Sequence, residues 1–263
     1  MDIKILQRKW DNLAKIDPLW AILADAEKKG NKWKIAEFFE TGVKEINSLM
    51  EYVDSLGITI AQANSRALDF GCGVGRLTQA LANYFDQVYG VDIAPSMIEL
   101  AETYNHQGNK CKYFLNNSSN LNQFQDNSFD FIYSNITLQH VSPRYSRIYL
   151  KEFLRLLSKN GILIFQLPSE PNYHVLTKNN KGLIYAFIQN LPTFLIDLYF
   201  TGRYYLDQQR QTKKAAMDMY GIKQEKVMEL LEANGAKVLD IQENSSAGQE
   251  WISFQYCVTK TEK

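Results

Sequence analysis

Between residues 65 and 168, short apolar runs alternate with stretches in which apolar residues recur every three or four positions. This alternation is typical of a parallel β-sheet whose strands are joined by flanking helices. We predict strands at 67–70, 87–92, 112–115, 129–134 and 162–167. Helices are expected between them: one from Arg76, one that starts near Pro95, and one over 145–158 that stops at Gly161.

The segment 222–263 continues this pattern. It predicts a helix over 223–234, a break at Gly235, and two strands at 237–241 and 251–259. The polar loop ENSSAGQE between those strands fits an antiparallel finish to the sheet. The expected fold class is therefore α/β, with a mostly parallel seven-stranded sheet, helices on both faces and an antiparallel last strand.

Two regions lie outside this alternation: a helical N-terminal cap over 1–64 and a helical insertion over 169–221. The cap precedes the core over 65–168, and the insertion separates this core from its last elements over 222–263. Within the insertion, 183–200 carries only one charge, but Gln189, Asn190 and Pro192 interrupt it, which argues against a membrane-spanning helix. Two amphipathic helices that meet at NLP are expected instead. In order of preference, they line an acceptor pocket as a lid, form a dimer contact or lie on a membrane surface.

Composition narrows the function. Lysine plus arginine and aspartate plus glutamate number 29 each, so no net positive field attracts a nucleic acid, and we expect none as a partner. The three cysteines are widely spaced and have no neighbouring metal-ligand pattern, so neither a disulfide framework nor a metal site is expected. The first twenty residues lack the apolar stretch of a signal peptide, which predicts a cytoplasmic protein. We expect this protein to be either a monomer or a homodimer.

The strongest chemical signal is ALDFGCGVGRLT, in which a strand leads into Gly71, Gly73 and Gly75 and then into a helix. Glycines here allow a sharp turn and a close approach of the backbone to a ligand, and the helix start offers unpaired N–H groups. The spacing is GxGxG, preceded by Asp69, whereas the dinucleotide fingerprint is GxGxxG. A carboxylate there would repel a phosphate but could hold an ammonium group, directly or through water, which favours S-adenosylmethionine.

A second acid, Asp92, ends the next strand in GVDIAPSM, where an acid is expected to bind both ribose hydroxyls of a nucleoside. Taken alone, the glycine-rich loop could be a tight turn that binds no ligand. The loop, the preceding acid and the second acid together favour a binding site.

The segment ALDFGCGVGRLT resembles motif I of class I S-adenosylmethionine-dependent methyltransferases, and GVDIAPSMIELA resembles their motif II. With DNSFDFIYSNITLQHV and GILIFQLP, the resemblance spans residues 65 to 168. It implies a Rossmann-like fold that binds S-adenosylmethionine and releases S-adenosylhomocysteine. The residues that it places at the donor are Asp69, Gly71, Cys72, Gly73, Gly75, Arg76, Asp92, Ile93, Met97, Asn117, Ser118, Ser134 and Asn135.

Within this set, Asn117 stands where the family often has an aspartate beside the adenine, and its side-chain carbonyl can accept a hydrogen bond. The alignment can slip by one residue at this point, and a simple polar turn is the other interpretation. His140 is the histidine at a strand-end loop of this site and is our candidate general base. The alternative is a histidine at a helix start, satisfied by backbone groups.

Methyl transfer is an in-line displacement, so the protein mainly aligns two reactants in a pocket that is poor in water. We predict transfer to an oxygen or nitrogen of a small molecule, a natural product or saccharide, because the C-terminal segment resembles bacterial methyltransferases of the small-molecule and glycan-tailoring type. Two other functions stay open: an NAD-dependent oxidoreductase, and a non-catalytic partner protein that binds S-adenosylmethionine.

Overall fold

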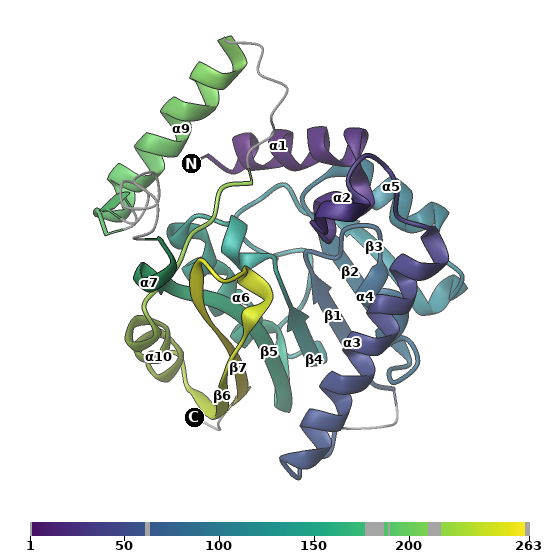
Figure 1. The fold of residues 1–263 in the computed structure, drawn as a ribbon. Coiled ribbons are helices and arrows are strands. Elements are labelled where there is room, and N and C mark those ends of the chain that lie inside the picture. The colour runs from purple at the N-terminus through teal and green to yellow at the C-terminus, as the bar shows by residue number, and fades with distance from the viewer. Residues whose placement is uncertain (1, 61–63, 177–186, 189, 210–216, 261–263) are drawn as a thin grey trace.

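A computed structural model describes residues 2–60, 64–176, 187–188, 190–209 and 217–260 (Figure 1). It contains a seven-stranded sheet in the order β3-β2-β1-β4-β5-β7-β6. The strands are β1 (Arg66–Phe70), β2 (Gln87–Asp92), β3 (Cys111–Leu115), β4 (Phe129–Ser134), β5 (Leu157–Pro171), β6 (Ala236–Glu243) and β7 (Trp251–Lys260). The α-helices are α1 (Ile3–Ile16), α2 (Pro18–Ile22), α3 (Ile35–Ser55), α4 (Arg76–Leu81), α5 (Pro95–Thr103), α6 (Pro143–Leu156), α7 (Tyr173–Leu176), α9 (Thr193–Gln209) and α10 (Gln224–Ala233). Short 3-10 helices are η1 (Ala26–Lys28), η2 (Gly108–Lys110), η3 (Leu138–His140) and η4 (Ser245–Ala247).

The sheet confirms the predicted fold class. Strands β1 to β5 pair in parallel, and β7 runs antiparallel between β5 and β6. β2 and β4 have the predicted bounds, whereas β5 is longer than predicted at both ends. The predicted helix stop at Gly161 is wrong, because α6 ends at Leu156 and the chain enters β5 at once. The pairing of β5 with β4 at Leu157 and with β7 through Pro171 accounts for this extension, which the local apolar run did not reveal.

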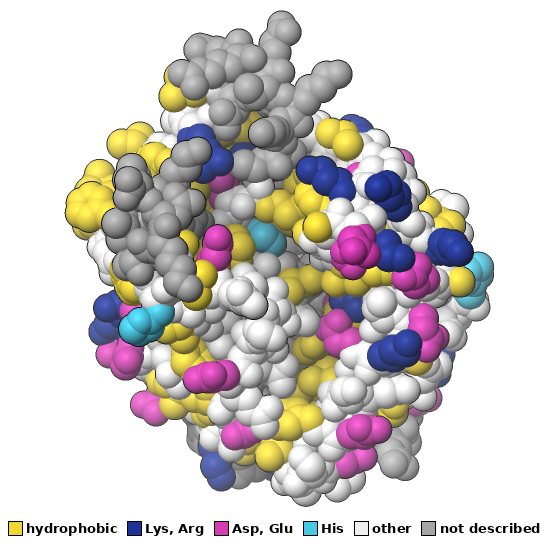
Figure 2. Space-filling view, in the orientation of Figure 1, with side chains coloured by type: hydrophobic (Ala, Val, Ile, Leu, Met, Phe, Trp, Pro, Cys, Tyr) yellow, Lys and Arg dark blue, Asp and Glu magenta, His cyan; other side chains and the backbone are white. Residues whose placement is uncertain are grey.

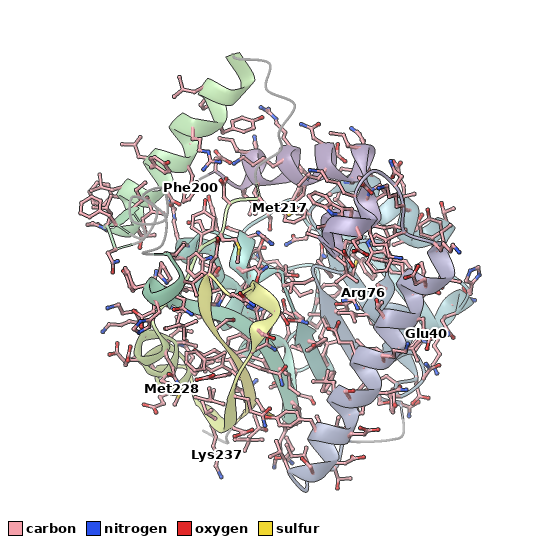
Figure 3. The ribbon with its side chains drawn as sticks, viewed as in Figure 1. Glu40, Arg76, Phe200, Met217, Met228 and Lys237 are labelled. Carbon is pink, nitrogen blue, oxygen red and sulfur yellow. The ribbon has the colours of Figure 1, made fainter. Side chains whose placement is uncertain are left out.

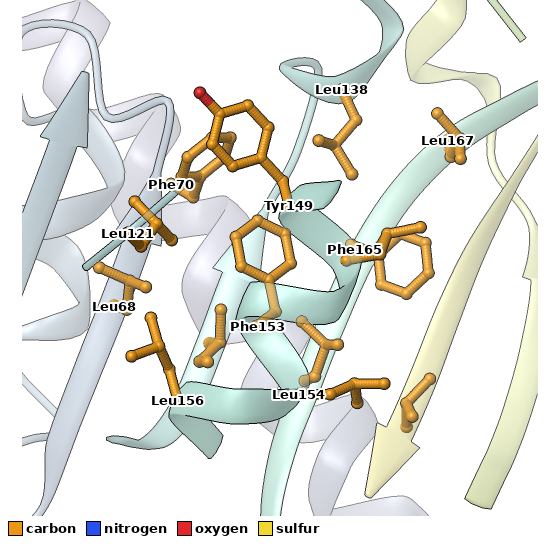
Figure 4. Close-up of a cluster of buried hydrophobic side chains, with 14 of the residues drawn as sticks. Leu68, Phe70, Leu121, Leu138, Tyr149, Phe153, Leu154, Leu156, Phe165 and Leu167 are labelled. Carbon is orange, nitrogen blue, oxygen red and sulfur yellow. The ribbon is translucent and has the colours of Figure 1, made fainter. Parts of the chain in front are cut away.

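Alternate side chains of β1 pack into two hydrophobic layers on opposite faces of the sheet. Leu68 and Phe70 join the cluster formed with α6 and α10, part of which is shown in Figure 4. Ala67 joins the second cluster, formed with α3 and α4. Burying one large apolar side chain contributes about 1.5–3 kcal/mol, so these layers hold the carboxyl ends of the strands in fixed positions.

The N-terminal helices have two different positions. The long helix α3 packs beside α4 and contributes Ile46, Leu49 and Val53 to the second cluster. By contrast, α1 and α2 lie over the carboxyl ends of β1 and β2 (Figure 1), where Leu13 and Leu19 pack against residues of the glycine loop and of α5. The expected helical extension is therefore present, and part of it covers the edge of the sheet at which ligands bind in this class of fold.

The insertion contains α9, which begins directly after Pro192, as the NLP sequence predicted. The first of the two expected helices falls largely on 183–186, outside the described residues. The inner side of α9 places Ile196 and Phe200 against Tyr220, and Figure 3 shows Phe200 on this helix. Among the residues that the structure describes, no helix combines the length and apolar character needed to cross a bilayer.

Candidate functional site

The glycine loop turns sharply between β1 and α4. Gly71, Gly73 and Gly75 have φ of +82°, +51° and +85°, a left-handed conformation that residues with a Cβ rarely adopt. A Cβ on Gly71 would lie 2.1 Å from the Thr137 hydroxyl oxygen, and one on Gly73 would lie 2.4 Å from a methyl carbon of Ile22. Both the conformation and the close contacts therefore require glycine at this turn.

Asp92 is fixed at the end of β2, next to this loop. One of its carboxylate oxygens accepts a hydrogen bond from the backbone N–H of Gly73 at 2.9 Å, and the other accepts one from that of Ala94 at 2.8 Å. Surrounding protein raises the pKa of Asp92 by desolvation, and these backbone hydrogen bonds oppose the rise. Each oxygen keeps a second lone pair, so the carboxylate can still accept hydrogen bonds from a ligand.

A pocket lies between the carboxyl ends of the strands and helices α1 and α2. Its wall is mainly apolar and includes Leu6 and Trp10 of α1 and Ile22 of α2. Among the polar groups on the wall are Asp92 and Asn116, at the ends of neighbouring strands. A mostly apolar pocket with a few placed polar groups is the usual form of a small-molecule site.

Five of the residues predicted at the donor line this pocket, namely Gly71, Gly73, Asp92, Ile93 and Met97. The others lie around it without contributing to its described wall: Asp69, Cys72, Gly75, Arg76, Asn117, Ser118, Ser134 and Asn135. Ser134 is buried, and its hydroxyl donates to the carbonyl oxygen of Phe70 at 3.0 Å. It supports the strand end from which the glycine loop starts.

Asp69 is buried beneath the loop, on the side of the sheet covered by α3 and α4. Its carboxylate accepts a hydrogen bond of 2.6 Å from the hydroxyl of Thr78. Burial raises the pKa of Asp69 to about 7; the hydrogen bond from Thr78 and the charge of Arg76 act in the opposite direction. The side chain therefore braces the end of β1 and the start of the glycine loop against α4.

Arg76 and Asn135 share an acidic partner on α3 that the sequence did not reveal. Glu45 accepts a hydrogen bond from Asn135 at 2.8 Å and forms an ion pair of 2.8 Å with Arg76, which is only 2% exposed. Figure 3 shows Arg76 at the start of α4, beside α3. This network ties the N-terminal segment to the two loops that flank the pocket. No local motif marks Glu45, because its partners lie 31 and 90 positions further along the chain.

At the end of β3, two adjacent asparagines occupy different environments. Asn116 is buried and lines the pocket, and its backbone N–H donates to the carbonyl oxygen of Asp92 at 2.8 Å. Asn117, the predicted residue, is exposed. The displacement by one position follows from the pairing of β3 with β2, which places Leu115 beside Asp92 and Asn116 directly after it. Tyr149 of α6 lies on the same wall, one helical turn before Phe153 of the hydrophobic core.

His140 lies outside the main pocket, in a smaller cavity on the other side of Trp10. The two rings make an edge contact with centroids 5.0 Å apart, and Lys9 and Asp218 also line this cavity. The Nδ1 of His140 lies 2.8 Å from the carbonyl oxygen of Asp218, and its Nε2 lies 3.1 Å from the amide nitrogen of Gln139. A carbonyl accepts only, so Nδ1 carries the proton and Nε2 the lone pair. Burial lowers the pKa of His140, which keeps the ring neutral.

These groups suit a nucleoside that carries a cationic amino-acid tail. An acid at the end of β2 is available for two hydroxyls, Asn116 offers an amide to a base edge, and the glycine loop lets its backbone come close to the ligand. Aromatic rings of Trp10 and Tyr149 on the wall suit a positive charge, since ring faces attract cations.

Comparison with known proteins agrees with this geometry. Residues 68–165 match a family model described as a methyltransferase domain. Over these residues the chain is similar to a methyltransferase domain. The chain is 29% identical over 113 residues to a ubiquinone biosynthesis O-methyltransferase of Xanthomonas euvesicatoria, covering 42% of this chain and 46% of that protein. It is also 29% identical over 146 residues to a sterol 4-C-methyltransferase of Caenorhabditis elegans, covering 52% and 42%.

The fold of the chain also matches solved structures. The crystal structure of a magnesium protoporphyrin IX methyltransferase from Synechocystis, with bound SAH, aligns with a TM-score of 0.63 over 99% of this chain and 100% of that one. Its sequence identity is 16%, so the likeness concerns the fold. The chain spans about half the length of the curated relatives that it matches.

Proposed function

We propose that the protein is an S-adenosylmethionine-dependent methyltransferase that moves a methyl group to an oxygen or nitrogen of a small molecule. The observation that carries the proposal is the Asp92 carboxylate, held by the N–H groups of Gly73 and Ala94 at the rim of the glycine loop. This acid and the loop form one rigid unit, which is the arrangement that ribose recognition needs. The matching family model supports the same activity.

In this proposal, Asp92 binds the ribose hydroxyls and Asn116 takes the place on the adenine side that we first gave to Asn117. The backbone of Gly71 and Gly73 lies against the amino-acid tail. Asp69 and Arg76 act from beneath the loop, by keeping its conformation. The donor, when bound, supplies a methyl group that is already activated by positive sulfur, so the chain itself has to bind, orient and exclude water.

Water exclusion falls to α1 and α2. Leu6, Trp10 and Ile22 cover the pocket from the side opposite the sheet, and Ile22 lies against Gly73. An apolar cover of this kind favours displacement on the methyl carbon by the acceptor over hydrolysis by solvent.

We place the acceptor at the side of the pocket that faces Trp10 and the His140 cavity. His140 remains our candidate general base: its neutral ring offers the Nε2 lone pair once the neighbouring amide of Gln139 turns away. A base is needed for a hydroxyl or a protonated amine. The named relatives are an O-methyltransferase of ubiquinone biosynthesis and a sterol 4-C-methyltransferase, so together they support methylation of a small molecule in general.

The test is calorimetric titration of the purified protein with S-adenosylmethionine, S-adenosylhomocysteine and NAD in parallel. We expect binding of both sulfur ligands and none of NAD. Binding of NAD alone would assign the glycine loop to an oxidoreductase. Methyl transfer from labelled donor to a panel of phenolic, amine and glycoside acceptors then separates an enzyme from a protein that only binds the donor.

A further inference from the structure

The outer side of α9 exposes an unusual amount of apolar surface. Every exposed position of this helix for which the structure describes the side chain is aliphatic, aromatic or glycine. Phe194 is 69% exposed and Leu198 is 66% exposed, although large apolar residues of this kind are normally buried. We call the set Phe194, Leu198, Tyr199, Tyr205 and Leu206, together with Phe187 just before the helix, the α9 patch. Figure 2 shows hydrophobic side chains at the upper-left edge, where Figure 1 places α9.

The patch follows the geometry of the helix. Phe194, Leu198 and Tyr205 are separated by four and seven positions, which aligns them along one stripe of an α-helix, and Tyr199 and Leu206 flank that stripe. The opposite side is occupied, since Ile196 and Phe200 are buried. The helix is therefore anchored to the protein by one side and presents the other side to its surroundings.

The charge of the surrounding sequence indicates what covers the patch. The whole chain is balanced, but residues 177–216 contain six lysines and arginines and two aspartates. Arg210, Lys213 and Lys214 follow α9 directly, and Lys178 and Lys181 precede it. An apolar helix face accompanied by basic residues fits the interface of an anionic lipid bilayer. A second copy of the chain carries the same basic sequence, so an anionic surface is the partner of complementary charge.

The position of α9 connects the patch to the proposed acceptor side. Asp197 on this helix accepts a hydrogen bond of 2.7 Å from Ser142, at the start of α6, and Tyr204 lies below the ammonium group of Lys9 at 5.4 Å. Lys9 in turn pairs with Asp218 in the cavity that contains His140. The contacts of Ser142 and Lys9 therefore connect α9, which carries the patch, to the proposed acceptor side of the pocket.

From these observations we infer that the α9 patch docks the protein on an anionic membrane surface, with α9 lying in the plane of the interface. The inference concerns a surface away from the donor pocket and stands whether or not S-adenosylmethionine is the donor. If both hold, the acceptor is an amphiphilic molecule that the bilayer carries.

The experiment is co-sedimentation of the full-length protein with vesicles of phosphatidylcholine alone, or mixed equally with phosphatidylglycerol. We expect binding to the mixed vesicles, weakened by higher salt, as screening of a charged contact requires. A variant with Phe194→Ser, Leu198→Ser and Tyr205→Ser should bind at least about tenfold more weakly, because each apolar side chain that enters the interface contributes strongly. The matched control replaces Ile16, Ile35 and Leu56, which are also exposed but lie elsewhere, by serine; it should bind like the original protein.

Three results would overturn the inference. They are no sedimentation with either type of vesicle, equal binding of the α9 variant and the original protein, or a dimer in light scattering that the α9 substitutions dissociate while vesicles fail to bind. The last result would make the patch a contact between two copies. Circular dichroism and donor titration of each variant check that the substitutions left the fold and the donor pocket intact.

Discussion

Replacing Asp92 by alanine tests the centre of the proposed donor site. Its carboxylate accepts two backbone hydrogen bonds, from Gly73 and Ala94, and would accept two more from the ribose. A hydrogen bond to a charged group contributes about 1.5–3 kcal/mol, so losing both ribose contacts costs about 3–6 kcal/mol of binding free energy. The dissociation constant for S-adenosylhomocysteine should therefore rise by roughly two to four orders of magnitude.

The substitution also affects the free protein. Without the carboxylate, the N–H groups of Gly73 and Ala94 lose their acceptor, which costs roughly 1–3 kcal/mol each if water does not replace it. A matched control is Asp86→Ala, at the other end of the same strand, whose carboxylate also accepts a backbone hydrogen bond, from Ser65 at 3.0 Å. Asp92→Asn keeps an oxygen acceptor and the side-chain shape, so its loss of affinity should lie between that of the alanine variant and none.

The assay is calorimetric titration with S-adenosylhomocysteine, preceded by urea unfolding of each variant to show that it is folded. A folded Asp92→Ala protein with unchanged affinity would refute the assignment of Asp92 to the ribose. An equal loss of affinity in Asp86→Ala would mean that destabilisation of β2, and not a ligand contact, explains the result.

Three further predictions concern other residues of the candidate site. Asn116→Ala should weaken S-adenosylhomocysteine binding by roughly five- to tenfold, the loss of one hydrogen bond, whereas Asn117→Ala should leave the calorimetric titration unchanged; the opposite order would restore our first assignment. Burial in the folded protein raises the pKa of Asp69 to about 7, above its value of about 4 in the unfolded chain. The free energy of unfolding is therefore highest below about pH 4, where Asp69 is protonated in both states, and falls as the pH rises through 7. Unfolding free energy of the ligand-free protein should fall over this window by up to about 4 kcal/mol, and Asp69→Asn should remove that slope in urea titrations; a slope retained by the variant would contradict it. His140→Ala should lower the methyl-transfer rate by roughly a hundredfold or more without weakening donor binding, and an unchanged rate would leave His140 a structural role only.

The parts of the fold that were predicted correctly depend on local sequence. The bounds of β2 and β4 follow from short apolar runs between turn residues, and the glycine loop follows from a spacing that only one kind of turn accommodates. Asp92 was also found in this way, because strand, turn and helix succeed one another there within a few residues. These elements need no information about distant parts of the chain.

The residues that were missed depend on contacts between distant segments. Glu45 acquires its importance only when α3 packs beside α4 and meets Arg76. The choice between Asn116 and Asn117 depends on the register of β3 against β2, and a shift of one position exchanges a buried residue for an exposed one. Sequence periodicity identifies both asparagines as polar residues after a strand, and it cannot supply the register.

The first helix unites the two halves of the candidate site. Trp10 of α1 lines the proposed donor pocket and also contacts His140 in the neighbouring cavity. One position earlier, Lys9 pairs with Asp218 and lies over Tyr204 of α9. A displacement of α1 would therefore open the donor pocket and, at the same time, release the contacts that hold the acceptor side and α9. Because a single helix carries both sets of contacts, donor and acceptor binding in this protein should be coupled through α1, with the energy of that coupling set by the Trp10 and Lys9 contacts.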